Sequence, residues 1–264
     1  MSYISVFLLV LICCDLFGKS KFVIMIPSYN NERWAEENVL SALNQEYDDF
    51  RVIYINDAST DRTLEIVERV KREQDIHGKL TIFSNLKNQG AMANWYNYIH
   101  QYVEDEEIVV NLDGDDQLAS KQVLAFLDRI YSHPRRKIWL TYGSYGTGLS
   151  HTSRHCSKLP WTDQKTRFYR SHPFVSSHLR TFKAWLFKKI DVGDLCYRDK
   201  FLDIACDTAM MYPMLEMASN RHFLYIKKVL YIYNTLNPIT DDKKRGYQQL
   251  IDDYVRSLPE YSPL

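Results

Sequence analysis

The sequence predicts an α/β fold built on a doubly wound, mostly parallel sheet. Four short runs rich in Val and Ile are apolar on both faces, as the strands of a parallel sheet covered by helices are. Amphipathic helical patterns lie between these runs, so strand and helix alternate along the first half of the chain. The chain has 264 residues and is 45% hydrophobic, which is enough to bury the core of such a sheet.

The expected elements of the first half follow one another closely. Strands are expected at residues 21–30, 51–59, 80–85 and 107–116. Helices are expected between them at residues 33–47, 63–72 and 90–103. In the first helix Val39, Leu43 and Tyr47 recur at helical spacing and predict one buried face.

After Ser120 the alternation becomes less regular. Helices are expected at residues 121–133, 177–190 and 207–219, and strands at 138–146 and 223–234. At the start of the helix expected at 177–190, His178, Arg180 and Lys183 are interpreted as residues of a solvated face; the alternative is that they face a ligand. Residues 147–177 show no clear period and are expected to form a mobile or substrate-covering loop.

The N-terminal segment, residues 1–18, carries an apolar run from Ile4 to Cys14 that is short for a membrane span. Its length suits a signal peptide, but no Lys or Arg precedes the run and no clear cleavage site follows it. A signal, an interfacial anchor and a buried strand therefore stay open, and with them a cytoplasmic, a membrane-associated or a secreted location. Residues 19–264 are expected to form one domain.

Charge and cysteine content exclude several classes. Lys plus Arg and Asp plus Glu number 33 each, and no long basic block occurs, so a nucleic acid partner is not expected. Three cysteines lie outside the N-terminal segment, and no C-x-x-C pair is present, which argues against a disulfide framework and a zinc site. The group His151, His155 and Cys156 lacks a fourth ligand and is interpreted as a solvated loop.

Acidic residues crowd the end of the fourth apolar run. Asp113 and Asp115 flank Gly114, and Asp116 follows. Two carboxylates on a tight turn are costly to bury as anions unless a divalent cation, completed by phosphate oxygens, satisfies them. Mg²⁺ and Mn²⁺ suit such a site, whereas the EF-hand pattern fails at its Gly and Glu positions. The alternative is an acidic cluster at the start of the following helix.

The other three runs of the first half also end in polar residues. In open α/β sheets ligands bind beyond the carboxyl ends of the strands, so these ends are expected to line one site. Asp57, at the end of the second run, can accept hydrogen bonds from a base N–H or from a ribose hydroxyl.

Four motifs in this order resemble glycosyltransferase family 2, a family of inverting enzymes with the GT-A fold: "IPSYNNE", "YINDASTDRT", "NLKNQGAMANWYNYI" and "VVNLDGDD". The resemblance covers residues 21–120, which it implies are the nucleotide-binding half, with an acceptor half at 121–264. It implies a nucleoside diphosphate sugar as donor, held by Pro27, Tyr29, Asn30, Asp57, Asn88, Gly90, Asn94 and Asp113. It also implies Mn²⁺ or Mg²⁺ at Asp113 and Asp115.

The resemblance further implies a general base at the start of a later helix. Family members usually carry a Glu-Asp pair there, and in this chain Cys206 precedes Asp207, so Asp207 is the expected base. Because the Glu is missing, a non-catalytic binder of nucleotide sugars or glycans is the alternative function. The acceptor, whether glycan, lipid or protein, is left open, and a lipid acceptor would agree with peripheral association with a membrane.

Overall fold

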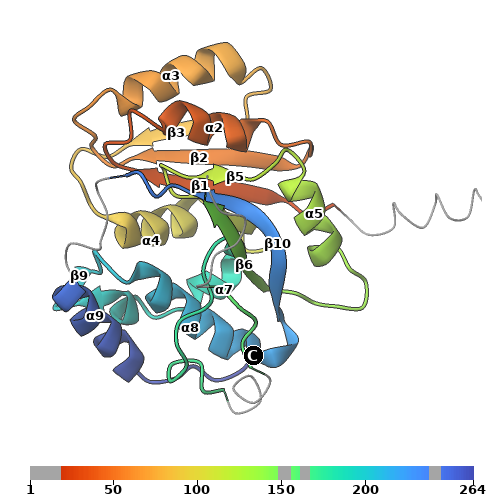
Figure 1. The fold of residues 1–264 in the computed structure, drawn as a ribbon, viewed down its shortest axis with the longest axis vertical. Helices are drawn as coiled ribbons and strands as arrows, with labels where there is room; N and C mark the ends of the chain where they lie inside the picture. The colour runs from red at the N-terminus through yellow and green to blue at the C-terminus, as the bar shows by residue number, and fades with distance from the viewer. Residues whose placement is uncertain (1–18, 148–155, 161–166, 238–244) are drawn as a thin grey trace, which may run out of the picture.

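The computed structural model describes residues 19–147, 156–160, 167–237 and 245–264 (Figure 1). Expectations for residues 1–18, for His151 and for His155 lie outside these ranges. The described residues contain an eight-stranded sheet with the order β3-β2-β1-β4-β7-β6-β10-β5. Figure 1 shows α2 and α3 on one side of this sheet and α4, α7 and α8 on the other. The predicted α/β class is confirmed.

The first half forms the parallel part of the sheet. Its strands are β1 (Phe22–Ser28), β2 (Phe50–Asn56), β3 (Leu80–Ser84) and β4 (Ile108–Asn111), and each pairs in parallel with its neighbour. The helices between them are α2 (Ala35–Leu43), α3 (Thr63–Gln74) and α4 (Ala91–Tyr102). All seven elements were predicted, because each is encoded by a local apolar pattern.

Strand β1 shows why these runs are apolar on both faces. Phe22, Ile24 and Ile26 are buried in the core beneath α2 and α3. Val23 and Met25 point to the opposite core, which α4, α7 and α8 cover. Side chains alternate along a strand, so a strand covered on both sides needs apolar residues at every position.

The second half completes the sheet. Helix α5 (Val123–Tyr131), strand β6 (Leu140–Thr147), helix α8 (Cys206–Ala218) and strand β10 (Phe223–Tyr233) lie where the sequence predicted them. Short elements were not predicted: β5 (Gln117–Leu118), η1 (Val192–Leu195), β8 (Cys196–Tyr197), β9 (Lys200–Phe201) and η2 (Ser219–Arg221). The final helix, α9 (Arg245–Ser257), was also missed.

The prediction of a single helix at residues 177–190 is wrong. The chain instead forms β7 (Thr181–Lys183), followed by the short helix α7 (Ala184–Lys188). Strand β7 runs antiparallel between β4 and β6 and is paired with both. Pairing on two sides, together with the full burial of Thr181 and Phe182, outweighs the helical spacing of the apolar residues.

A buried ion pair fixes the C-terminal helix against α8. Arg170 donates to Glu216 at 2.6 Å, and the side chains of both residues are almost fully buried. The same guanidinium donates to the carbonyl oxygens of Val255 and Leu258, so it bridges α8 and the end of α9.

Among the described residues no helix combines the length and the apolar character needed to cross a membrane.

Candidate active site

A cleft of about 410 Å³ opens near the carboxyl ends of the parallel strands. Asp113 and Asp115, which follow β4, and Asp207, in the first turn of α8, all line it. These are the two acids predicted to hold a cation and the acid predicted to be the base. The fold therefore brings together candidates that are almost a hundred positions apart in the sequence.

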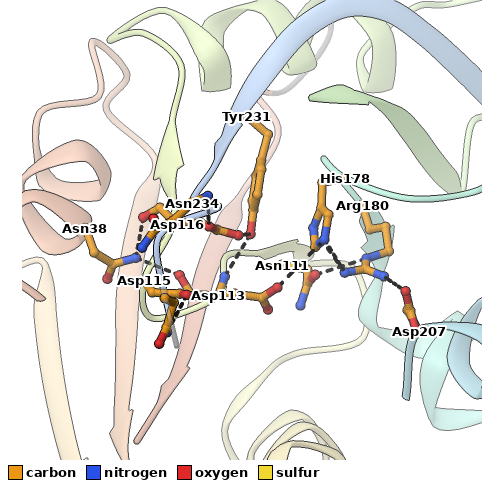
Figure 2. Close-up of polar contacts among 11 residues, drawn as sticks. Asn38, Asn111, Asp113, Asp115, Asp116, His178, Arg180, Asp207, Tyr231 and Asn234 are labelled. Carbon is orange, nitrogen blue, oxygen red and sulfur yellow. Dashed lines mark hydrogen bonds and ion pairs between the residues drawn. The ribbon is translucent and has the colours of Figure 1, made fainter. Parts of the chain in front are cut away.

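The loop that carries the acids is fixed from two sides (Figure 2). The side-chain amide of Asn38, on α2, donates to the backbone oxygens of Asp113 at 2.8 Å and of Asp116 at 2.7 Å. From the other side, the carboxylate of Asp116 accepts hydrogen bonds from the Tyr231 hydroxyl and the Asn234 N–H, both at 2.6 Å. The loop that carries Asp113 and Asp115 is thus held in place by contacts with α2 and with the end of β10.

Gly114 allows this loop to pack against β1. A Cβ atom at this position would lie 2.6 Å from Cβ of Ser28 and 2.5 Å from its Oγ. Both distances are shorter than atoms tolerate, so the position between the two acids admits only glycine without a shift of the loop.

The acids crowd one another in partly dehydrated surroundings. Burial raises the pKa of Asp113, Asp115 and Asp116, and neighbouring carboxylates raise those of Asp113 and Asp116 further. Arg180 opposes this effect at Asp113. Potential ligand atoms of Asp113, Asp116 and His178 lie within 4.8 Å of one another. Such a concentration of carboxylates has the chemistry of a site for a divalent cation.

His178 and Arg180 belong to this site, and their interpretation as solvated helix residues is wrong. They are only 6% and 4% exposed, because they immediately precede β7 rather than begin a helix. Lys183, at the end of β7, lies apart and pairs with Glu106. The β-branched and aromatic residues Thr181 and Phe182 were the available signal for a strand.

Arg180 connects the acid loop to α8 (Figure 2). Its Nε donates to Oδ1 of Asn111 at 3.1 Å, and its Nη2 lies 3.0 Å from Nδ1 of His178. Its Nη1 lies 3.1 Å from Oδ2 of Asp207. Burial disfavours the charged form of Arg180, but Asp207 and Asp113 outweigh this, so its pKa is raised and it stays cationic.

His178 is held in its neutral form. Burial, and then the charge of Arg180, lower its pKa well below the usual value. Its ring stacks on Tyr231 with a centroid distance of 4.4 Å, and its Nε2 lies 3.8 Å from Oδ2 of Asp113. Neutral imidazole is the form that binds metal ions, so His178 adds a possible nitrogen ligand that was not predicted.

Asp207 lies on the far side of the cleft from the acid loop, with its side chain 39% exposed. It lies in the first turn of α8, where the helix dipole favours a negative charge. The preceding residue, Cys206, directs its thiol to the backbone oxygen of Leu202 at 3.5 Å. The thiol therefore supplies no second acid at this point.

Apart from Asp113, the predicted nucleotide-binding residues lie in or next to the loops after β1, β2 and β3 and are not among the described lining residues of the cleft. Asp57 is 3% exposed, and its carboxylate accepts from the N–H groups of Gln89 and Gly90, each at 2.9 Å. It also accepts from the Asn85 side chain at 2.7 Å. Asp57 therefore fixes the loop that leads into α4.

The remaining nucleotide candidates divide between buried and exposed positions. Asn94 is buried and accepts from the Asn85 amide at 2.8 Å. Asn30 accepts from the Thr60 N–H at 2.8 Å and so joins the loops after β1 and β2. Pro27 is half-buried at the end of β1, whereas the ring of Tyr29 and the side chain of Asn88 are exposed. These loops form one interlinked surface.

Comparison with known proteins shows relatives in sequence. The model of the family "Glycosyl transferase family 2" matches residues 23–191. Over 117 residues, 42% of this chain and 20% of the relative, the sequence is 30% identical to the poly(ribitol-phosphate) beta-N-acetylglucosaminyltransferase TarS of Staphylococcus aureus. It is 27% identical over 117 residues to the GalNAc(5)-diNAcBac-PP-undecaprenol beta-1,3-glucosyltransferase of Campylobacter jejuni, covering 43% of this chain and 36% of that protein. The matched stretches thus cover less than half of the length of each of these relatives.

Solved structures with the same fold include two nucleotide-sugar complexes. TarS 1–349 of S. aureus in complex with UDP-GlcNAc superposes with a TM-score of 0.60 at 18% identity, covering 91% of this chain and 68% of that one. The mannosyltransferase PcManGT of Pyrobaculum calidifontis, in complex with GDP-Man and Mn²⁺, gives a TM-score of 0.61 at 17% identity, covering 92% and 66%. At these identities the likeness is one of fold.

Proposed function

The chain belongs to glycosyl transferase family 2 and has a GT-A fold, and on this basis we propose that it transfers a sugar from a nucleoside diphosphate to an acceptor hydroxyl with inversion at the anomeric carbon. The observation that carries the proposal is that Asp113, Asp115 and Asp207 line one cleft. A donor held by the first two acids would present its sugar toward the third.

In this proposal Asp207 is the general base. It accepts the proton of the acceptor hydroxyl as that oxygen attacks the anomeric carbon, and the nucleoside diphosphate leaves from the opposite side. A positioned base of this kind contributes about 10²–10⁴ in rate. The ion pair with Arg180 supports the assignment, because it directs one oxygen of Asp207 while the side chain stays accessible from the cleft.

Asp113 and Asp115 are the proposed ligands of Mn²⁺ or Mg²⁺. The fit rests on three acids whose pKa values are raised by burial in one loop, with neutral His178 beside them. Asp116 is the weaker candidate, since both of its oxygens already accept short hydrogen bonds. A bound cation would supply compensation for the negative charge of the diphosphate leaving group.

The loops after β1, β2 and β3 are the proposed nucleoside-binding surface. Tyr29 offers an exposed ring for stacking on a base, and Asn88 offers an exposed amide. Asp57 retains capacity to accept one more hydrogen bond, because a carboxylate has about four acceptor positions and three are occupied. Pro27, Asn30, Gly90 and Asn94 would shape this surface through the backbone and through the contacts between the loops.

The acceptor is proposed to be a glycan or a glycan carried on a lipid or protein. The names of the two relatives give a poly(ribitol-phosphate) acceptor for TarS and an undecaprenol-linked one for the Campylobacter enzyme. We also propose a cytoplasmic or membrane-associated location, or a secretory route if the apolar residues 1–18 act as a signal.

A non-catalytic binder of nucleotide sugars is the second candidate. The observation in its favour is Cys206 at the position before Asp207, where the thiol supplies no second carboxylate. A binder would hold donor and cation at the acids after β4 but would show no turnover.

A donor screen separates these two functions. The full chain would be incubated with UDP-, GDP-, dTDP- and CMP-sugars and Mn²⁺, and release of nucleotide measured with and without EDTA. Release from one donor, lost with EDTA and in Asp115→Ala, is the expected result. Binding of a nucleotide sugar without release, even when glycan acceptors are added, would favour the binder. No binding of any member of the panel would contradict both.

A further inference from the structure

A second cleft, of about 390 Å³, lies against the first. Ala205, Asp207 and Gln248 line both clefts. The second cleft is completed by residues of α8, α9 and the segment before β7: Phe174, Thr208, Gln249, Asp252 and Arg256. Helix α9 runs beside α8 here (Figure 1). Asp207 therefore lies at the junction of two spaces, of which only the first contains the acids after β4.

We propose that the second cleft is the acceptor subsite and that it takes an uncharged sugar. This inference rests on the proposed function, in which Asp207 is the base. A base that deprotonates the acceptor must contact both reactants, and Asp207 is the acid that reaches both clefts. With the donor in the first cleft, the second is the space left for the attacking hydroxyl.

The charges of this cleft are already compensated. Asp207 is paired with Arg180 at 3.1 Å, and Asp252 accepts from Nε of Arg256 at 2.6 Å. Arg256 also donates to the backbone oxygens of Arg170 and His172. Among the described lining residues, then, every cation is engaged by protein groups. Among these described residues a phosphate-bearing acceptor would find no uncommitted cation, and it would meet the carboxylates of Asp207 and Asp252.

The remaining groups suit a neutral polyol. The amide of Gln248 can both donate to and accept from hydroxyl groups. Gln249 uses one N–H to donate to Asp253 at 2.8 Å and has a second N–H and an amide oxygen for a ligand. Phe174 is half-buried, held edge-on to Tyr212 at a ring-centroid distance of 5.9 Å, and forms an apolar wall. Aromatic walls with a few polar groups are typical of sites for small uncharged ligands, and the C–H face of a sugar ring matches such a wall.

The proposed transfer forms one bond and breaks one bond at the anomeric carbon. The acceptor oxygen gives its proton to Asp207 and forms a bond to the anomeric carbon. The bond between that carbon and the diphosphate oxygen breaks, and the nucleoside diphosphate leaves with the electron pair. Gln248, which lines both clefts, can form a hydrogen bond with a second hydroxyl of the acceptor and so orient the attacking hydroxyl toward Asp207.

The test measures nucleotide release from the donor found in the screen, with Mn²⁺ and the full chain, with and without added acceptor. Neutral methyl glycosides of common hexoses are compared with ribitol phosphate and glycerol phosphate. The two cleft variants are Phe174→Ala and, as the milder change, Gln249→Ala. The control is Leu250→Ala, because Leu250 is exposed on α9 and lines neither cleft.

The expected result is that a neutral glycoside accelerates release and that both cleft variants raise the acceptor KM, by about tenfold for Phe174→Ala. The donor KM and the slow hydrolysis without acceptor should equal those of the control. The assignment would be overturned if only the phosphate compounds accelerated nucleotide release. It would also be overturned if no neutral glycoside accelerated release although the donor was still hydrolysed. So would unchanged acceptor KM values in both variants. Absence of donor binding and of hydrolysis would instead refute the proposed function.

Discussion

Arg180 and Asp207 form an ion pair of 3.1 Å that joins the segment entering β7 to the first turn of α8. The same guanidinium bonds Asn111, at the end of β4, and His178. One buried cation thus ties the proposed base to the strand that leads into the acid loop. The relative position of the two halves of the site depends on this residue.

Replacing Arg180 with lysine should therefore impair turnover more than donor binding. Lysine keeps the charge but lacks the planar fork that reaches three partners at once. Misplacing Asp207 by about 1 Å should reduce kcat roughly 10- to 100-fold. Steady-state kinetics with the donor varied gives kcat and KM separately. Lys183→Arg, at the end of the strand that follows Arg180 and paired with Glu106, is the control. An unchanged kcat in Arg180→Lys would contradict the positioning role.

Asp207→Asn should abolish most of the activity while leaving the donor bound. The amide keeps the size of the side chain but cannot take a proton at neutral pH, so kcat should fall about 10²–10⁴-fold. Donor affinity, measured by calorimetry, should change little. Asp203→Asn is the matched control, because Asp203 lines the same cleft without a proposed role in proton transfer. Equal activity of the two variants would show that the base lies elsewhere.

Gly114→Ala should displace the acid loop. The new methyl group would meet Ser28, whose Cβ lies 2.6 Å from the ideal Cβ position, so the loop must shift. We expect a loss of about 1–3 kcal/mol in the free energy of unfolding and a weaker effect of Mn²⁺ on activity. Urea denaturation and a metal titration measure these. In Gly246→Ala the added methyl group meets open space, so neither the stability nor the effect of Mn²⁺ on activity should fall. A wild-type metal response in Gly114→Ala would contradict the argument.

The sequence predicted the parallel half of the fold because its signals are local. Strands β1 to β4 are continuous apolar runs, and polar residues mark their ends, so Asp113 and Asp115 could be placed at the edge of the sheet. Asp207 was predicted as the base from its resemblance to a family motif and not from a local pattern of apolar and polar residues. Its position across the cleft from Asp113 and Asp115 depends on the complete fold and could not be predicted from the sequence.

The parts that escaped prediction depend on partners distant in the sequence. Strand β7 is specified by hydrogen bonds to β4 and β6, and nothing in its own few residues outweighs the helical spacing around it. With β7 unrecognised, His178 and Arg180 were placed on a solvated face. The contacts of Asn38 and Tyr231 with the acid loop join α2 and β10 to residues 75 to 118 positions away, which no periodicity reveals.

The stability of the cation-free protein should fall as the pH rises. Burial, and then Asp113 and Asp115, raise the pKa of Asp116 to about 8, well above its value in the unfolded chain. The protonated form is thus favoured by folding, and its contribution, fully present below about pH 4, is lost as the pH rises through about 8.

Thermal unfolding in EDTA should show this dependence as a Tm that decreases from about pH 5 to about pH 8. Mg²⁺ should raise the Tm more at the higher pH, because the ionised acids bind it and the protonated ones do not. Asp116→Asn should flatten the profile measured in EDTA. A variant profile parallel to that of the wild type would assign the pH dependence to other groups.

Asp57→Asn tests whether the loop after β3 contributes to donor binding. The carboxylate holds Gln89 N–H, Gly90 N–H and the Asn85 amide, and asparagine would turn an NH₂ group toward one of these donors. Loss of one such charged hydrogen bond should cost about 1.5–3 kcal/mol of stability. If the nucleoside lies on this loop, the donor KM should also rise.

The informative control is Asp61→Asn. Asp61 accepts from the N–H groups of Glu32 and Thr63, so it fixes a loop on the same edge of the sheet by the same chemistry, but it has no proposed contact with the donor. Both variants should lose stability in urea denaturation, and only Asp57→Asn should raise the donor KM. If both KM values stay at the wild-type level, Asp57 serves the architecture of the loop alone, and the nucleoside must be held by the exposed Tyr29 and Asn88.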